Sequence, residues 1–166
     1  IELLLADNPF YAESGGQVSD TGTVQGEGWS VAVERVRKDP RGQVLVGTAA
    51  GTVAPGPVRA TVDRARRRDI ERNHSATHLL HAALKKLLGP HVVQAGSLVA
   101  PDRLRFDFNH FTPLTPEEIR HIESSVNELV LRNHDVQTVV NDYDQAVKDG
   151  AVALFGEKYD SRVRVV

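Results

Sequence analysis

Apolar and polar residues alternate along the first part of the chain, and this pattern predicts short β-strands. The clearest alternation lies at residues 30–37, and the turn at 38–43, which contains Pro and Gly, leads to a partner strand at 44–46. Further strands are predicted at 1–5 and 58–62. Several short strands separated by Gly/Pro turns favour a small β-barrel.

Near residue 63 the spacing of apolar residues changes from two to three or four positions. This period predicts one long α-helix that begins at about residue 64 and ends at Leu88, because Gly89 and Pro90 are strong stop signals. The buried face of this helix is predicted to include Ile70, Thr77, Leu80, Leu84, Leu87 and Leu88.

Beyond the long helix, strands and helices alternate. Thr115, Pro116 and Glu118 are arranged as a capping box, which predicts the start of a second helix. The predicted elements are strands at 92–99 and 103–108, a helix from 116 to about 133, a strand at 136–140, a short helix at 143–148 and the start of a strand at 162–166. The predicted fold class is therefore α+β, with a small β-barrel at 1–63 followed by a layered α/β domain at 64–166.

Two histidines, His74 and His78, lie four residues apart in the long helix. Residues at i and i+4 share one helix face, so both imidazoles can point towards one metal ion. Zinc proteases carry a glutamate directly after the first histidine, and Ser75 at this position excludes that class. The spacing alone leaves two interpretations: two ligands of another kind of metal site, or polar residues at the margin of a core.

The composition limits the kinds of metal site and the cellular location that can be expected for this protein. The 166 residues include no cysteine, so this sequence supplies neither a disulfide nor a cysteine metal ligand. They also include no methionine, which we interpret as a segment of a longer protein. No apolar run is long enough to span a bilayer and no signal peptide is recognisable, so we expect a cytoplasmic protein with no membrane partner.

Charge is distributed unevenly along the chain. The formal net charge of −2 argues against a generic nucleic-acid binder. The stretch 59–72 nevertheless contains six arginines: Arg59, Arg64, Arg66, Arg67, Arg68 and Arg72. Two interpretations stay open for it: a solvated helix start with ion pairs, or a local patch that contacts RNA phosphates.

Three blocks of the sequence resemble the editing region of alanyl-tRNA synthetases. They are the Gly-rich turn at 8–22, the histidine segment at 72–81, and Gln94–Val99 with the strand that follows it. The closing stretch at 150–159 is also similar, and free-standing alanyl-tRNA editing proteins share part of the pattern. The resemblance covers nearly the whole chain in order. It implies an aminoacyl-tRNA deacylase that hydrolyses seryl- or glycyl-tRNA(Ala).

The resemblance also implies roles for individual residues. His74 and His78 match two zinc ligands, Thr77 matches a position that lines the amino-acid pocket, and Gln94 matches a glutamine near the scissile ester. A hydroxyl at Thr77 can hydrogen-bond the hydroxyl of serine. A helix threonine can equally bond back to a backbone carbonyl.

The Gly15-Gly16-Gln17 segment is predicted to form a tight turn that brings backbone close to the site, with Gln17 pointing inward. We expect Gly15 and Gly16 to bind substrate, and Gln17 to act in catalysis together with Gln94 and Thr77. Arg64, Arg68 and Arg72 are the candidates for contacts with the acceptor end of the tRNA. Other polar residues are predicted to have no direct role: Asp20 as a turn residue, His81 as a structural residue, and His91, His110, His121 and His134 as surface or cap residues.

The zinc site of the family is completed by a Cys-x-x-x-His motif beyond the closing stretch, and this sequence does not contain it. Only two of the four expected ligands are present, so we expect weak or no zinc binding and no hydrolysis by this chain alone. In the family, ATP belongs to the separate catalytic domain of the synthetase.

The expected partners are the acceptor end of tRNA(Ala), carrying serine or glycine, and the remaining domains of the synthetase. Two alternatives stay open: a free-standing editing protein, and a non-catalytic module that docks tRNA or joins domains. The absence of methionine and the synthetase-like closing stretch disfavour the first alternative.

Overall fold

The computed structural model of the chain describes residues 1–151 and 160–165. The chain divides into two compact units, residues 1–115 and residues 116–166. Both helices and antiparallel sheets are present, which confirms the α+β class predicted from the sequence. The predicted division at residue 63 falls inside the first unit, between a sheet and a long helix, and it stays a prediction.

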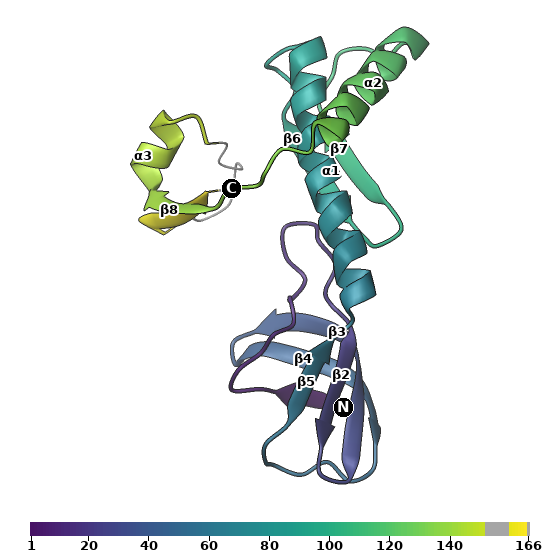
Figure 1. Ribbon diagram of the computed structural model, residues 1–166, viewed down its shortest axis with the longest axis vertical. Helices are drawn as coiled ribbons and strands as arrows, with labels where there is room; N and C mark the ends of the chain where they lie inside the picture. Colours follow the sequence, from purple (N-terminus) through teal and green to yellow (C-terminus); the bar gives the residue numbers. More distant parts are fainter. Residues whose placement is uncertain (152–159, 166) are drawn as a thin grey trace. The chain divides into compact units, whose positions relative to one another are not determined.

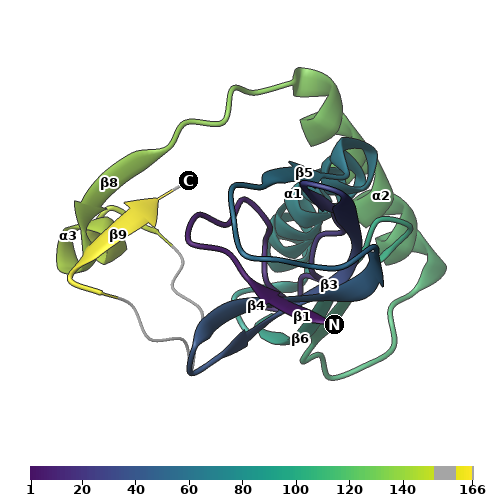
Figure 2. The ribbon, with the colours of Figure 1, turned by 90° about the horizontal axis from the view of Figure 1, so that it is seen from below.

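The first unit begins with a five-stranded antiparallel sheet of order β1-β4-β3-β2-β5 (Figures 1 and 2). Its strands are β1 (Glu2–Leu4), β2 (Gly22–Gly26), β3 (Trp29–Asp39), β4 (Gly42–Ala50) and β5 (Arg59–Val62). β1 and β5 stand at the two ends of this order, and closure of the sheet into the predicted barrel stays a prediction.

A β-bulge between Val33 and Arg35 changes which residues of β3 face the core. Before the bulge, alternate residues up to Val33 are buried; at the bulge Glu34 and Arg35 are both exposed, and Val36 is buried next. The bulge therefore lets both halves of a long strand cover one core. That core consists of Phe10, Ala12, Val24, Trp29, Val31, Val33, Val36 and Leu45.

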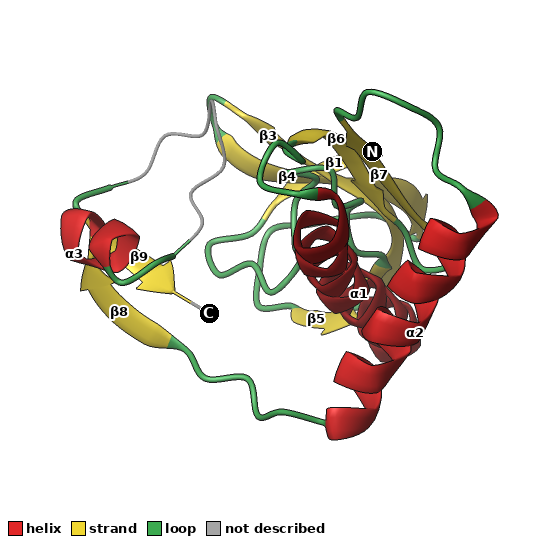
Figure 3. Ribbon diagram, turned by 90° about the horizontal axis from the view of Figure 1, so that it is seen from above, coloured by secondary structure: helices red, strands yellow, loops and turns green. Residues whose placement is uncertain are grey.

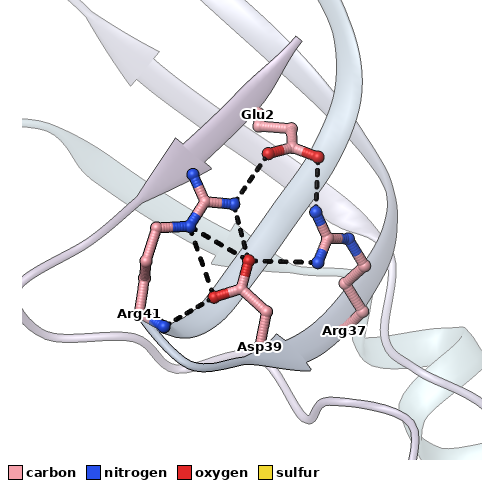
Figure 4. Close-up of polar contacts among 4 residues, drawn as sticks. All are labelled: Glu2, Arg37, Asp39 and Arg41. Atoms are coloured by element: carbon pink, nitrogen blue, oxygen red, sulfur yellow. Dashed lines mark hydrogen bonds and ion pairs between the residues drawn. The ribbon is translucent and has the colours of Figure 1, made fainter.

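Four charged side chains connect β1 with the hairpin formed by β3 and β4 (Figure 4). Glu2 accepts hydrogen bonds from Arg37 at 2.5 Å and from Arg41 at 3.0 Å. Asp39 accepts from the same two arginines, and hydrogen bonds from the Arg41 side chain are the main reason that the pKa of Asp39 falls to about 2. The edge strand β1 is thus joined to its neighbours by charge as well as by backbone pairing.

The long helix α1 (Arg64–Leu88) begins and ends where the sequence predicts. At its start the Asp63 carboxylate accepts the backbone N–H of Arg66 at 3.1 Å. At its end Gly89, with φ of 115°, donates its N–H to the carbonyl of Lys85 at 3.0 Å. Within the predicted buried face, Ile70, Thr77 and Leu84 are buried, whereas Leu87 is 42% exposed.

A strand pair, β6 (Gln94–Val99) and β7 (Leu104–Phe108), lies against α1 (Figure 1). Two contacts show that β6 runs antiparallel to the helix. Asn73 donates to the Ala100 carbonyl at 2.7 Å, and His81 Nε2 lies 3.4 Å from the Val92 carbonyl oxygen. Gln94 falls between these two contacts, alongside the part of α1 that contains the histidines.

The second unit contains α2 (Pro116–Arg132), β8 (Val139–Asp142), α3 (Tyr143–Lys148) and β9 (Arg162–Val165). Figure 3 shows α3 beside the antiparallel pair of β8 and β9. The predicted closing stretch at 150–159 lies mostly on residues 152–159, outside the described residues. Among the helices of the described residues, none combines the length and the apolar character needed to cross a membrane.

Candidate functional site

The Gly15-Gly16 pair forms a two-residue hairpin turn. Ser14 and Gln17 exchange backbone hydrogen bonds at 3.2 and 3.0 Å, with Gly15 at φ 58° and Gly16 at φ 81° between them. Positive φ at both central residues is what such a tight turn requires, and glycine adopts it at little cost. The tight turn predicted from the sequence is therefore present, while its role in substrate binding stays a prediction.

This turn lies directly on β6. The Val99 N–H donates to the Gly16 carbonyl at 2.8 Å, and Val18 N–H donates to the Val99 carbonyl at 3.0 Å. A Cβ atom on Gly16 would lie 2.5 Å from the Ser97 carbonyl oxygen, so a side chain at this position cannot be accommodated without movement. Glycine is therefore required at position 16 both for the turn and for the close approach of the turn to β6.

Gln17 points inward, as the sequence predicts, and contacts His74. Gln17 is 8% exposed, and its Oε1 lies 2.6 Å from His74 Nδ1 although the two residues are 57 positions apart. One turn further along α1, the His78 ring stacks on the His74 ring, with centroids 5.1 Å apart and an interplanar angle of 20°. The turn and the helix therefore meet at the histidine pair.

The two imidazoles fit part of a zinc site. Ring nitrogens of neutral histidine are common zinc ligands, and a tetrahedral shell needs four ligands. Across residues 1–151 and 160–165, no group of three or more His, Cys, Asp or Glu side chains could hold a metal ion. His74 and His78 thus supply two donors of the right type, and completion of the shell needs donors from elsewhere.

The pKa of His78 is lower than usual, mainly because part of the ring is removed from water. Positive charge on His74 and His81 would lower it further. A lower pKa favours the neutral imidazole near neutral pH, and this is the form that binds metal.

Thr77 is buried between these histidines along the helix, with 5% of its surface exposed. Its hydroxyl donates to the Asn73 carbonyl at 2.8 Å, which is the backbone bond that a helix threonine can make without any functional role. The oxygen still has lone pairs that can accept a hydrogen bond. Its predicted role in the amino-acid pocket stays a prediction.

Gln94 is the first residue of β6, and a bulge between Gln94 and Gly96 separates it from the regular pairing with β7. It is partly exposed, and within the described part of the chain its side-chain amide has no hydrogen-bond partner. An amide that is both accessible and unpaired can donate to and accept from a ligand.

The arginines near the start of α1 divide into two groups. Arg64, Arg68 and Arg72 recur every four residues on one exposed stripe, and Arg72 pairs with Asp69. Arg67 instead binds the buried carboxylate of Asp20, and its pKa is raised, chiefly by that hydrogen bond. Asp20, predicted as a turn residue, therefore also holds the turn segment to the helix.

Two histidines for which the sequence predicts no functional role contact each other. His91 Nε2 lies 3.0 Å from His110 Nδ1, and the rings stack with centroids 5.2 Å apart. Sequence reasoning missed this pair because the residues follow different elements, α1 and β7, and no local spacing connects them. His81, predicted as structural, packs on Phe106 with ring centroids 5.0 Å apart.

Comparison with known proteins shows which proteins this chain is similar to. The alanine–tRNA ligases of Thermotoga petrophila, Chelativorans sp. (strain BNC1) and Mesorhizobium japonicum are 53%, 50% and 48% identical to the chain, and each match covers 100% of it. The whole chain is similar to one segment of alanine–tRNA ligases. It spans about one fifth of their length, 19–20%. No protein-family model matches the chain.

Proposed function

We propose that this chain is the editing module of an alanine–tRNA ligase and hydrolyses tRNA(Ala) mischarged with serine or glycine. The observation that carries the proposal is the contact between Gln17 and His74, because it joins the Gly15-Gly16-Gln17 turn to the helix with the histidine pair. Both segments belong to the blocks that resemble the editing region. The similarity to alanine–tRNA ligases over the whole chain supports the same assignment.

Zinc is the proposed cofactor. His74 and His78 provide two imidazole ligands, and the remaining ligands come from residues outside this sequence, which contains no cysteine. When bound, zinc polarises the ester carbonyl and orients water. ATP belongs to the separate catalytic domain of the ligase and has no role at this site.

Some groups of the proposed site act on every aminoacyl ester, and one group recognises the side chain of the amino acid. In the hydrolysis, the oxygen of water bonds to the ester carbonyl carbon, the bond to the 3′ oxygen of the tRNA breaks, and that oxygen receives a proton. The accessible amide of Gln94 orients the ester or the water through hydrogen bonds. Thr77 Oγ1 accepts a hydrogen bond from the serine hydroxyl, a contact that alanine cannot make.

Arg64, Arg68 and Arg72 contact the phosphates of the acceptor end. Their exposed stripe begins at the start of α1, in the half of the helix that leads to His74. A short row of guanidinium groups attracts phosphate locally even though the chain has a formal net charge of −2.

The proposal is tested in the complete protein that contains this chain, by release of serine from seryl-tRNA(Ala). His74→Ala and His78→Ala should each lower both bound zinc and the hydrolysis rate by at least about 100-fold, since each removes a ligand. His121→Ala is the matched control, because His121 is exposed on α2. Full hydrolysis by both ligand variants would overturn the proposal.

The same assay separates the proposal from a non-catalytic module that docks tRNA. If the complete protein binds tRNA(Ala) but releases serine no faster than buffer does, the docking role is correct. Zinc bound with a stoichiometry that does not change in His74→Ala and His78→Ala would show that the two histidines are structural.

A further inference from the structure

His74 and His81 lie on one helix, yet their rings face hydrogen-bond partners through different nitrogens. His74 uses Nδ1 towards Gln17 Oε1 at 2.6 Å. His81 uses Nε2 towards the carbonyl oxygen of Val92 at 3.4 Å. Carbonyl and amide oxygens only accept hydrogen bonds, so a hydrogen bond to each of these oxygens requires the proton on the ring nitrogen that faces it.

It follows that a neutral His74 has its proton on Nδ1 and its lone pair on Nε2. A histidine that binds metal through one ring nitrogen commonly donates its other N–H to an oxygen, which orients the ring and raises its basicity. Gln17 Oε1 occupies the place of that oxygen. Its contact with His74 is short and is removed from water, since Gln17 is 8% exposed.

The position of Gln17 is itself determined by the structure around the turn. The turn is bonded to β6 on both sides of Gln17, through Gly16 and Val18 to Val99. Three residues beyond Gln17, Asp20 is bound by Arg67 of α1. The glutamine therefore reaches His74 from a backbone that is attached to the helix and to the strand beside it.

We infer that Gln17 is a positioning residue that keeps the proton of His74 on Nδ1 and so presents Nε2 to the metal. This inference rests on the proposed function only for the identity of the bound ion, and it replaces a direct catalytic role for Gln17. In this role Gln17 acts on the reaction through the ring of His74 and not through a contact with the reacting atoms.

The first experiment measures tautomers in the metal-free 166-residue chain, by long-range ¹H–¹⁵N correlation of the histidine rings at a pH where they are neutral. His74 is expected with its proton on Nδ1 and His81 with its proton on Nε2, so the two rings act as references for each other. Gln17→Leu should move His74 to a tautomer mixture, and Gln17→Glu should restore the Nδ1–H form. Gln25→Leu, at an exposed position of β2, is the matched control.

The second experiment measures zinc affinity in the complete protein. Gln17→Leu should raise the Kd for zinc by about 10–100-fold, and Gln17→Glu should recover most of the loss. A proton on Nε2 of His74 in the unsubstituted chain overturns the inference, even if Gln17→Leu fails to fold. An unchanged tautomer in Gln17→Leu overturns it as well. Absence of deacylation with the predicted tautomers would remove the proposed function and leave the role of Gln17 in place.

Discussion

The guanidinium of Arg67 holds the carboxylate of Asp20 by two hydrogen bonds, from Nε to Oδ1 at 2.8 Å and from Nη2 to Oδ2. Asp20 is 1% exposed and also accepts the backbone N–H of Tyr11 at 2.6 Å. The same arginine donates to the Pro9 carbonyl at 3.2 Å. One ion pair therefore connects both sides of the Gly-rich turn segment with the first turn of α1.

Asp20→Asn should destabilise the chain by about 3 kcal/mol, because removal of one partner leaves the other charge without compensation in a partly buried place. Urea unfolding gives this free energy directly. The substitution should also speed amide hydrogen exchange in the turn segment before global unfolding, since the segment loses its connection to the helix.

The control for this prediction is Asp102→Asn. Asp102 pairs with Arg103 at 2.7 Å, but both side chains are about two-thirds exposed, at 64% and 66%. An exposed pair contributes at most about 1 kcal/mol. Equal losses of stability in the two variants would show that burial of Asp20 does not increase the contribution of its ion pair to the free energy of unfolding.

The two glycines of the turn allow a second comparison, because only one of them approaches other atoms. Gly15→Ala meets no atom within 4 Å and should cost only the strain of positive φ, about 1 kcal/mol. Gly16→Ala adds a Cβ 2.5 Å from the Ser97 carbonyl oxygen and should cost about 3 kcal/mol in total. Thermal unfolding of the two variants measures the difference, and similar losses would contradict the close approach of the turn to β6.

Local sequence signals were sufficient for the elements that have strong periodicity and caps. The helix from Arg64 to Leu88 has a four-residue repeat, an aspartate cap and Gly89 as its stop, and the structure has these same bounds. His74 and His78 could be placed on one face of that helix for the same reason, and their stacked rings confirm it.

Features that depend on distant partners could not be found in this way. β2 is a short strand with one fully buried residue, Val24, and it forms because β3 and β5 pair with it on either side. The bulge in β3 interrupts the alternation that predicted the strand. The contact of Gln17 with His74 joins residues 57 positions apart, and only the family resemblance connected them before the structure did.

Asp39 supplies a prediction about acid stability. Its pKa falls from the ordinary 3.8 to about 2 in the folded chain, mainly through hydrogen bonds from Arg41. A depressed pKa means that the ionised group stabilises the fold above its unfolded pKa, and this stabilisation is lost as the pH falls through the folded value. Between about pH 4 and about pH 2, the melting temperature of the unsubstituted chain should therefore fall more steeply than that of Asp39→Asn.

The measurement is a series of melting curves from about pH 5 to about pH 2 for both proteins, repeated at high salt. Carboxylates outside the cluster titrate equally in the two proteins, so the difference between the curves reports on Asp39 together with Glu2, which binds the same two arginines. High salt should reduce that difference, because the cluster of Glu2, Arg37, Asp39 and Arg41 is open to solvent on one side. Parallel curves at low salt would show that the cluster does not hold the carboxylate in its ionised form.

Selectivity in the complete protein is the last property that the site predicts. In the proposed function, zinc and Gln94 would act on groups that every aminoacyl ester has, so neither would distinguish serine from alanine. Thr77→Val keeps the volume of the side chain and removes the hydroxyl. The Asn73 carbonyl keeps its partner in the helix, the backbone N–H of residue 77, so the cost in stability should be small.

Thr77→Val should instead slow the hydrolysis of seryl-tRNA(Ala). The activation free energy should rise by about 1–3 kcal/mol, because a buried hydrogen bond to the serine hydroxyl is no longer made. Glycyl-tRNA(Ala) has no side chain to bind and should be hydrolysed at nearly the original rate. The decisive quantity is the ratio of the two deacylation rates, compared between Thr77→Val and the unsubstituted protein. Thr77→Ser is the control, because it retains the hydroxyl and should retain the ratio. A ratio that stays the same in Thr77→Val would leave the hydroxyl with the single role that the structure shows, the bond to Asn73.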